Sequence, residues 1–249
     1  MSLASAVQAA PGVYQGAANV IAAAMLLIEF GMLRQALARD QIRLYAAQSA
    51  LLSVLAVVIA ADRNLPELYA LAALSAALKV VAIPLVLRRL LGRAGPESRD
   101  EEELSGVAGS QTVSPASAVL GGIVLAAYGF FSFGGLRGVV PPGQQSGALG
   151  IHGPAAPATA LAVAAAMVLV AFGLMIVRRD VASQAIGFLA LENAISLAAL
   201  VVAAGLPLIL ETAFLFDLLV AIVVFGMLIR VHHVRAESLS TADLTRLQG

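Results

Sequence analysis

Three ionisable side chains interrupt otherwise apolar stretches of the sequence: Lys79, Glu192 and Asp217. A charge at the centre of a membrane-spanning helix costs roughly 2.5–3.5 kcal/mol on insertion scales, so such a residue is paired, neutralised or used. A low-dielectric environment favours the neutral form of a carboxyl group and of a lysine alike. Groups of this kind can gain and lose protons, and we predict that they take part in proton or cation transfer.

The three charges fall at a similar depth. Glu192 lies ten residues from the start of one apolar stretch, and Asp217 lies ten residues from the start of the next. At about 1.5 Å per residue, each is about 15 Å along its helix axis, close to the centre of a ~30 Å hydrocarbon core. Lys79 lies thirteen residues after Pro66 and nine before Arg88, again near the centre. We therefore predict one layer of ionisable groups, parallel to the membrane.

Other polar residues extend this layer. Glu29 lies toward the cytoplasmic end of the first apolar stretch, and Glu211 lies near the outer end of the last. Amide and hydroxyl side chains on these helices can hold water between the charges. They are Gln48, Ser53, Gln184, Asn193 and Ser196. A structural alternative stays open, in which Lys79 and one acid form a pair that fixes helix register, while Glu29 and Glu211 meet interfacial water or lipid headgroups.

The composition is that of an all-α integral membrane protein. Of 249 residues, 60% are hydrophobic and 12% are charged, whereas a soluble protein has about 25% charged residues. The formal net charge is zero, which gives no support for nucleic-acid binding. The sequence has no cysteine, and His232 and His233 lack metal-ligand spacing. It also lacks a phosphate-binding glycine loop and a nucleophile elbow. We therefore expect no metal, no other cofactor and no catalytic residue.

Seven stretches are long and apolar enough to cross a membrane, since a span needs about 20 residues. They cover residues 14–33, 44–61, 66–87, 116–136, 157–177, 182–204 and 207–229. Pro66, Pro157 and Pro207 stand at helix starts, where the missing N–H costs nothing. Pro84 lies inside the third span, where we expect it to kink the helix.

The arginines predict the orientation of these spans. Twelve fall on one side, and only Arg63 and Arg137 fall on the other. Because basic residues concentrate in cytoplasmic loops, we predict seven transmembrane helices with the N-terminus outside and the C-terminus in the cytoplasm. The membrane would be the cytoplasmic membrane of a bacterium or archaeon.

The chain divides into four predicted parts. These are a three-helix unit at 1–92, a flexible cytoplasmic linker at 93–115, a fourth span with an outer loop at 116–156, and a second three-helix unit at 157–249. A weak internal repeat at an offset of 144 residues matches Arg34 with Arg178 and Gln48 with Glu192. The first three spans would then echo the last three, as parallel repeats do in transporters. Chance matches between alanine- and leucine-rich helices are the alternative.

Small residues mark one face of the fourth span. Ala118, Gly122 and Ala126 follow one another at intervals of four residues. Such a stripe favours close contact between helices in a membrane. The sequence leaves open whether the neighbouring helix belongs to this chain or to another subunit.

Several features near the C-terminal end form a recognisable pattern. They are VRRD at 177–180, IGFLALENA at 186–194, and Asp217, which lies thirteen residues before Arg230. In these features, residues 157–249 resemble the small three-helix K subunit of respiratory complex I. Those subunits carry one glutamate in each of their last two helices. Counted from the paired arginines, the first glutamate falls on Leu189, about one helical turn from Glu192, and the second corresponds to Asp217 rather than Glu211.

The whole chain, with Lys79 and Pro84 in KVVAIP and with LEN at 191–193, resembles component E of hydrogenase-4 and formate-hydrogenlyase-type complexes. The resemblance implies a membrane-arm subunit beside antiporter-like subunits and a subunit similar to the quinone-site subunit of complex I. The peripheral arm of such complexes carries [NiFe]-hydrogenase-like and iron–sulfur subunits. Some relatives lack the hydrogenase metal ligands, so the redox reaction does not follow from this chain.

Together, the residues and the resemblance predict a non-catalytic subunit of a complex I-related, energy-converting complex. The predicted lateral proton or cation relay comprises Glu192, Asp217, Lys79, Glu29, Gln48 and Glu211. One alternative is a stand-alone secondary transporter or cation/proton antiporter subunit. Another is a purely structural scaffold for partner helices. The expected partners are other membrane subunits and the lipid bilayer.

Overall fold

The computed structural model describes residues 13–35, 37–92, 114–139, 158–178 and 181–202, together with Val220 and Gly226. Every regular element within these ranges is a helix. The helices are α1 (Val13–Arg34), α2 (Ala38–Arg63), α3 (Pro66–Ala76), the π-helical segment η2 (Ala77–Ala82), α4 (Ile83–Gly92), α6 (Pro115–Val139), α7 (Ala158–Val177) and α8 (Val181–Val202).

Six of these helical stretches are long and apolar enough to cross a membrane. They are Gly16–Arg34, Ala38–Ala61, Pro66–Arg89, Pro115–Phe133, Thr159–Val177 and Ala182–Val201. They coincide with the first six predicted spans to within three residues at each end, except that the second span begins at Ala38 and not at residue 44. Except for Val220 and Gly226, the seventh predicted span, 207–229, lies outside the described residues, as does the linker up to residue 113.

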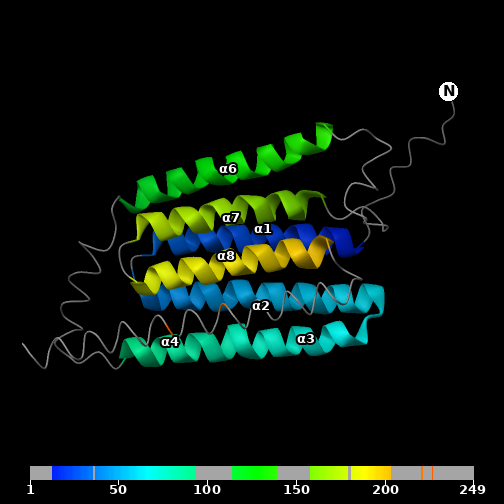
Figure 1. The fold of residues 1–249 in the computed structure, drawn as a ribbon, viewed down its shortest axis with the longest axis horizontal. Helices are drawn as coiled ribbons and strands as arrows, with labels where there is room; N and C mark the ends of the chain where they lie inside the picture. The colour runs from blue at the N-terminus through cyan, green and yellow to red at the C-terminus, as the bar shows by residue number, and fades with distance from the viewer. Residues whose placement is uncertain are drawn as a thin grey trace, which may run out of the picture.

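Four helices form the centre of the bundle. In it, α1 packs on α2 and α7, and α8 packs on α2 and α7, so the four helices close into a ring. One edge is formed by α6, which packs on α7 and α1, and the opposite edge by the rod of α3, η2 and α4, which packs on α2 (Figure 1). The described helices of the two predicted three-helix units therefore pack into one core.

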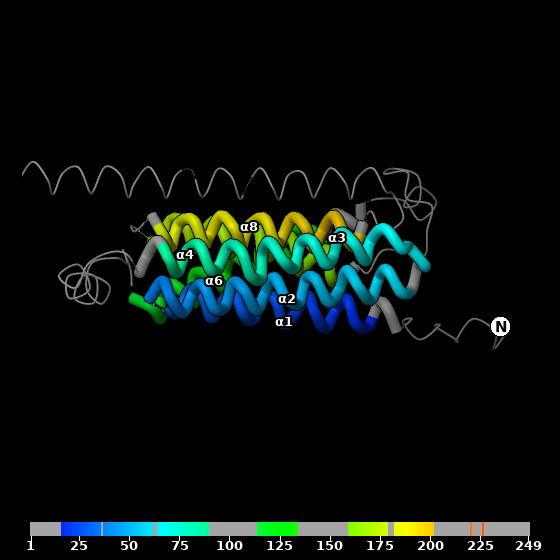
Figure 2. The backbone as a smooth tube through the Cα atoms, turned by 90° about the horizontal axis from the view of Figure 1, so that it is seen from below, coloured from blue at the N-terminus to red at the C-terminus, as the bar shows by residue number. Residues whose placement is uncertain are grey.

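Successive spans run antiparallel. The ends of α1, α4 and α7 and the starts of α2, α6 and α8 lie together at one end of the bundle (Figures 1 and 2). This alternation follows the distribution of arginines in the sequence. The membrane face that this end meets stays a prediction.

The distortion expected at Pro84 takes the form of a wider helical turn. The segment η2 ends at Ala82, and the backbone N–H of Ile83 donates to the carbonyl of Leu78, five residues earlier. Pro84 has no N–H, and its ring crowds the carbonyl of the preceding turn, so a π-helical turn directly before it relieves that crowding. Segments of this kind often occur at functional sites. Lys79 lies inside η2 and is buried.

The end of α1 is held by residues from two other helices. The buried guanidinium group of Arg178, which follows α7, donates from Nη2 to the carbonyls of Leu33 (3.2 Å) and Gln35. Gln41 of α2 donates from Nε2 to the same Gln35 carbonyl at 3.0 Å. These donors satisfy carbonyl groups that a helix end leaves unpaired. Arg178 therefore joins α7 to α1, while its proposed repeat partner, Arg34, is exposed.

The small-residue stripe of α6 faces this chain. Ala118, Gly122, Ala126 and Gly129 are all buried. A Cβ atom added at Gly122 would lie 2.5 Å from Leu33 Cδ1 of α1, and one added at Gly129 would lie 2.8 Å from Ala166 Cα of α7. The stripe therefore lets α6 approach α1 and α7 closely.

Gly129→Ala is expected to lower the free energy of unfolding by about 1–3 kcal/mol, because the new methyl group would meet backbone that cannot move aside cheaply. Gly121→Ala on the same helix is the matched control, since a Cβ atom there meets nothing within 4 Å. Denaturant titration of both variants in detergent would measure the difference. Equal stability of the two variants would contradict the close packing of α6 on α7.

Candidate functional site

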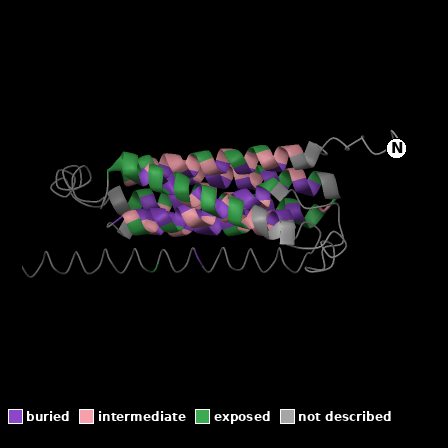
Figure 3. Ribbon diagram, turned by 90° about the horizontal axis from the view of Figure 1, so that it is seen from above, coloured by how far each residue is buried: buried purple, intermediate pink, exposed green. Residues whose placement is uncertain are grey.

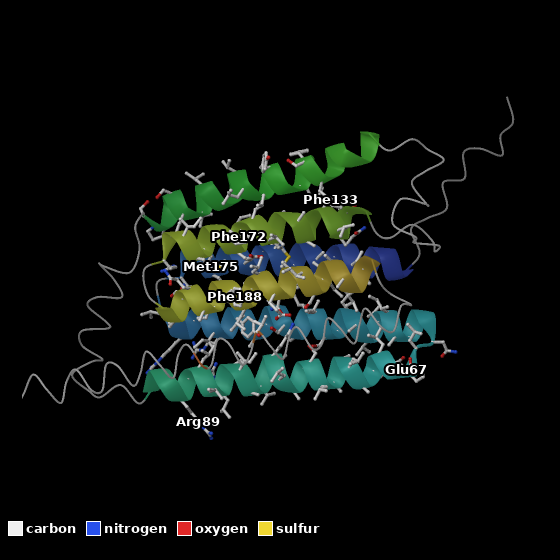
Figure 4. All side chains as sticks on the ribbon, viewed as in Figure 1. Glu67, Arg89, Phe133, Phe172, Met175 and Phe188 are labelled. Carbon is white, nitrogen blue, oxygen red and sulfur yellow. The ribbon has the colours of Figure 1, made fainter. Side chains whose placement is uncertain are left out.

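Lys79 and Glu192 form a buried ion pair between η2 and α8. Lys79 Nζ lies 2.5 Å from Glu192 Oε1, and only 1% and 3% of the two side chains are exposed. One turn along α8, the hydroxyl of Ser196 donates to the same carboxylate oxygen at 2.7 Å. Glu67 and Arg89 lie at opposite ends of the rod that carries Lys79 (Figure 4). At ~1.5 Å per residue along the helix axis, Lys79 is about 18 Å from Glu67 and about 15 Å from Arg89. The pair therefore lies midway along the bundle.

Asn193, next to Glu192 on α8, continues the polar contacts toward α2. Its Oδ1 accepts a hydrogen bond from Lys79 Nζ at 3.4 Å. Its Nδ2 donates to Gln48 Oε1 at 3.1 Å and to Ser49 Oγ at 2.9 Å. One carboxamide on α8 thus contacts groups on two other helical elements, η2 and α2.

Gln48 carries the contacts from α2 to α1. Its Nε2 lies 3.4 Å from the carbonyl oxygen of Met25 and 3.5 Å from Oε2 of Glu29. Both distances are long for a hydrogen bond. The other carboxyl oxygen of Glu29, Oε1, is buried and has no hydrogen-bond partner among the described residues. Glu29 is therefore a buried acid held by one weak side-chain contact.

These contacts form one continuous chain of polar groups, which we call the polar chain. It runs from η2 through α8 and α2 to α1, and its members are Lys79, Glu192, Asn193, Gln48 and Glu29. All five are buried inside a bundle whose remaining core is largely apolar; Figure 3 shows the buried residues along its interior. Ionisable groups stand at its two ends, with uncharged carboxamides between them.

The ion pair alone does not show whether Lys79 and Glu192 act in a proton relay or only stabilise the packing of the helices. Both interpretations predict a lysine paired with an acid, and replacing a buried pair by apolar residues is often neutral for stability. The continuation through Asn193 and Gln48 to a second acid is the feature that a register-fixing pair does not need. Removing one partner of a buried pair costs about 3–5 kcal/mol, since the other charge is left uncompensated.

Comparison with known proteins finds a similar sequence in a bacterium. The chain is 29% identical over 190 residues to a Mycobacterium tuberculosis protein described as "Uncharacterized protein Rv0085", covering 76% of this chain and 77% of that relative. No protein-family model matches the chain, and no solved structure matches it. The functional argument therefore rests on the site itself.

Four of the six predicted relay residues meet in the polar chain: Lys79, Glu192, Gln48 and Glu29. The other two, Asp217 and Glu211, lie outside the described residues. Of the suggested neighbours, Asn193 and Ser196 belong to the site, whereas Gln184 donates to the carbonyl of Arg178 at 2.9 Å. Within the described ranges, no three histidines or carboxylates are grouped as a metal site would require.

Ser49 was missed in the sequence. It accepts the hydrogen bond from Asn193, and its carbonyl accepts one from Ser53 at 3.0 Å. Serine is common in membrane spans, so the residue type alone did not indicate a role for Ser49. Its position in the sequence could have done so, because the offset of 144 residues matches Ser49 with Asn193 just as it matches Gln48 with Glu192. This contact between α2 and α8 is compatible with the proposed repeat.

Proposed function

We propose that this protein is a membrane-arm subunit of a complex I-related, energy-converting complex of the formate-hydrogenlyase or hydrogenase-4 type. Its task would be to contribute buried charged and polar side chains to a lateral proton or cation path. The observation that carries this proposal is the polar chain, because ionisable groups inside membrane spans are costly and commonly mark ion pathways.

The direction of the polar chain supports a lateral path. Its members come from four helical elements, and each contact joins neighbouring helices rather than successive turns of one helix. A path across the bundle would link antiporter-like and quinone-site-like neighbours on its two sides. A path along one helix would instead connect the two membrane faces.

The chemistry assigns different roles to the members of the chain. Lys79 and Glu192 are close enough to exchange a proton directly. Asn193 and Gln48 only donate and accept hydrogen bonds, since carboxamides have no readily titratable proton. Proton transfer between Glu192 and Glu29 would therefore need a file of water molecules beside the carboxamides, because contacts of 3.4 Å at Asn193 and 3.5 Å at Glu29 leave no room for water between the two atoms. The carboxamides would orient that water.

Purification in mild detergent, with identification of the co-purifying subunits, tests the proposed assembly. We expect antiporter-like and quinone-site-like membrane subunits together with an iron–sulfur peripheral arm. A chain that purifies alone and drives solute-dependent uptake into liposomes would instead support a stand-alone transporter. A complex that assembles but never depends on the polar chain for coupling would support a scaffold.

Asn193→Leu is expected to uncouple the two acids while the ion pair stays in place. The substitution keeps the branched shape of the side chain but removes its hydrogen bonds to Lys79, Gln48 and Ser49. Leaving those buried groups unpaired costs about 1–3 kcal/mol, and the ratio of protons translocated to electrons transferred should fall. Ile195→Leu, an exposed neighbour on α8, is the control and should change neither quantity. An unchanged ratio in Asn193→Leu would mean that the carboxamide is not part of the path.

A further inference from the structure

A cavity lies on the opposite side of the bundle from η2, where the end of α1 meets the start of α6. Its volume is about 580 Å³, and it is lined by Arg34, Pro115, Ala116, Val119 and Leu120. This volume is within the range of about 300–1,000 Å³ that ligand pockets occupy. The lining is apolar except for the one arginine.

Arg34 stands at the end of an exposed apolar line on α1. Val20, Leu27 and Arg34 follow one another at intervals of seven residues, which is two turns, so they share one helix face. Val20, Leu27 and Arg34 are all exposed. Arg34 forms no ion pair within the described part of the chain. This face therefore offers an unpaired cation next to apolar surface.

A similar line leaves the cavity along α6. Leu120 lines the cavity, and Val124 and Tyr128 follow it at intervals of four residues on the same face; all three are exposed. Exposed residues can be followed along α6 in Figure 3. Two apolar lines thus extend from one cavity, in the direction of the bundle axis.

The cavity lies at the ends of two candidate membrane spans. One candidate span ends at Arg34, and another begins at Pro115. Both residues line the cavity, so we expect its charged side at headgroup level and its apolar walls to continue into hydrocarbon. A ligand that fits has a negative charge at one end and two apolar chains at the other.

We propose that this cavity is a binding site for an anionic phospholipid. The phosphate accepts hydrogen bonds from the Arg34 guanidinium group, whose planar donors match phosphate oxygens. One acyl chain lies along Leu27 and Val20, and the other lies along Leu120 and Val124. Basic pockets between membrane helices bind acidic headgroups in this way. The site is separate from the polar chain and does not depend on the proposed function.

The test is the binding of phosphatidylglycerol, compared with phosphatidylcholine, to the full-length protein in detergent by native mass spectrometry. Loss of the arginine in Arg34→Gln should weaken phosphatidylglycerol binding about fivefold to tenfold and weaken phosphatidylcholine binding less, because the choline cation already offsets the charge of its phosphate. The matched control is Arg89→Gln, an exposed arginine at the same end of the bundle but on the α4 side (Figure 4). It should keep the affinity of the parent protein.

A second pair of variants tests the cavity itself. Ala116→Trp fills it and should remove the preference for phosphatidylglycerol, whereas Ile123→Trp places the same bulk on an exposed α6 residue outside the lining and should not. Equal affinity in Arg34→Gln and the parent protein would overturn the proposal, as would equal losses in Arg34→Gln and Arg89→Gln. A photo-crosslinker at position 116 that captures a polypeptide instead of lipid in native membranes would assign the cavity to a partner helix and overturn it too.

Discussion

Complexes that carry Glu192→Gln are expected to assemble and to transfer electrons but to lose most of their proton translocation. Glutamine has the shape of glutamate and can still accept hydrogen bonds from Lys79 and Ser196, which contact Glu192 at 2.5 and 2.7 Å. It cannot take up or release a proton. Removing a positioned acid–base group from an enzyme costs about 10²–10⁴-fold in rate, so we expect the translocation rate to fall at least about tenfold.

The measurement is acidification of proteoliposomes, normalised to electron transfer by the same preparation. Glu67→Gln is the matched control, because Glu67 is exposed and lies at the far end of the rod that carries Lys79. It should pump as the parent complex does. Full pumping by Glu192→Gln would reject a required role for this carboxylate, and equal losses in both variants would point to a general defect.

The second large effect is on stability. Lys79→Met and Glu192→Leu each leave one buried charge without its partner, and each should lower the free energy of unfolding by about 3–5 kcal/mol. The double variant removes both charges and should recover at least about half of the summed loss, since apolar replacement of a buried pair is often neutral. None of the three variants should translocate protons.

Denaturant titration of the four proteins in detergent completes this double-mutant cycle. Strict additivity of the two single effects would mean that Lys79 and Glu192 are not energetically coupled, contrary to their contact. Recovery of pumping together with stability in the double variant would favour the scaffold, because the charges would then serve only to fix the helices.

Parts of the fold follow directly from the sequence. The six described spans are long apolar stretches, so their hydrophobicity alone locates them. The charges of Lys79 and Glu192 stand out for the same reason, since each is set in apolar sequence. The contact between them follows less directly, because depth along a helix says nothing about which way the helix faces.

Other features depend on packing that the sequence does not encode locally. Arg178 has the sequence context of an arginine at a membrane boundary. In the structure it is buried, and its guanidinium group donates hydrogen bonds to carbonyl groups at the end of α1. That contact requires α1 and α7 to be neighbours, which residues far apart in the chain do not reveal. Pro84 predicts where its helix is distorted. It does not predict that the distortion is a π-helical turn that includes Lys79.

The most direct test of the polar chain is infrared difference spectroscopy of the carboxyl groups in the assembled complex, with and without turnover. We predict a band of a buried carboxyl group that changes with turnover and is absent in Glu29→Gln. In Glu192→Gln that band should remain but shift, because Asn193 and Gln48 connect the two sites. A turnover spectrum with no carboxyl change, or one identical in all three proteins, would contradict a path through these residues.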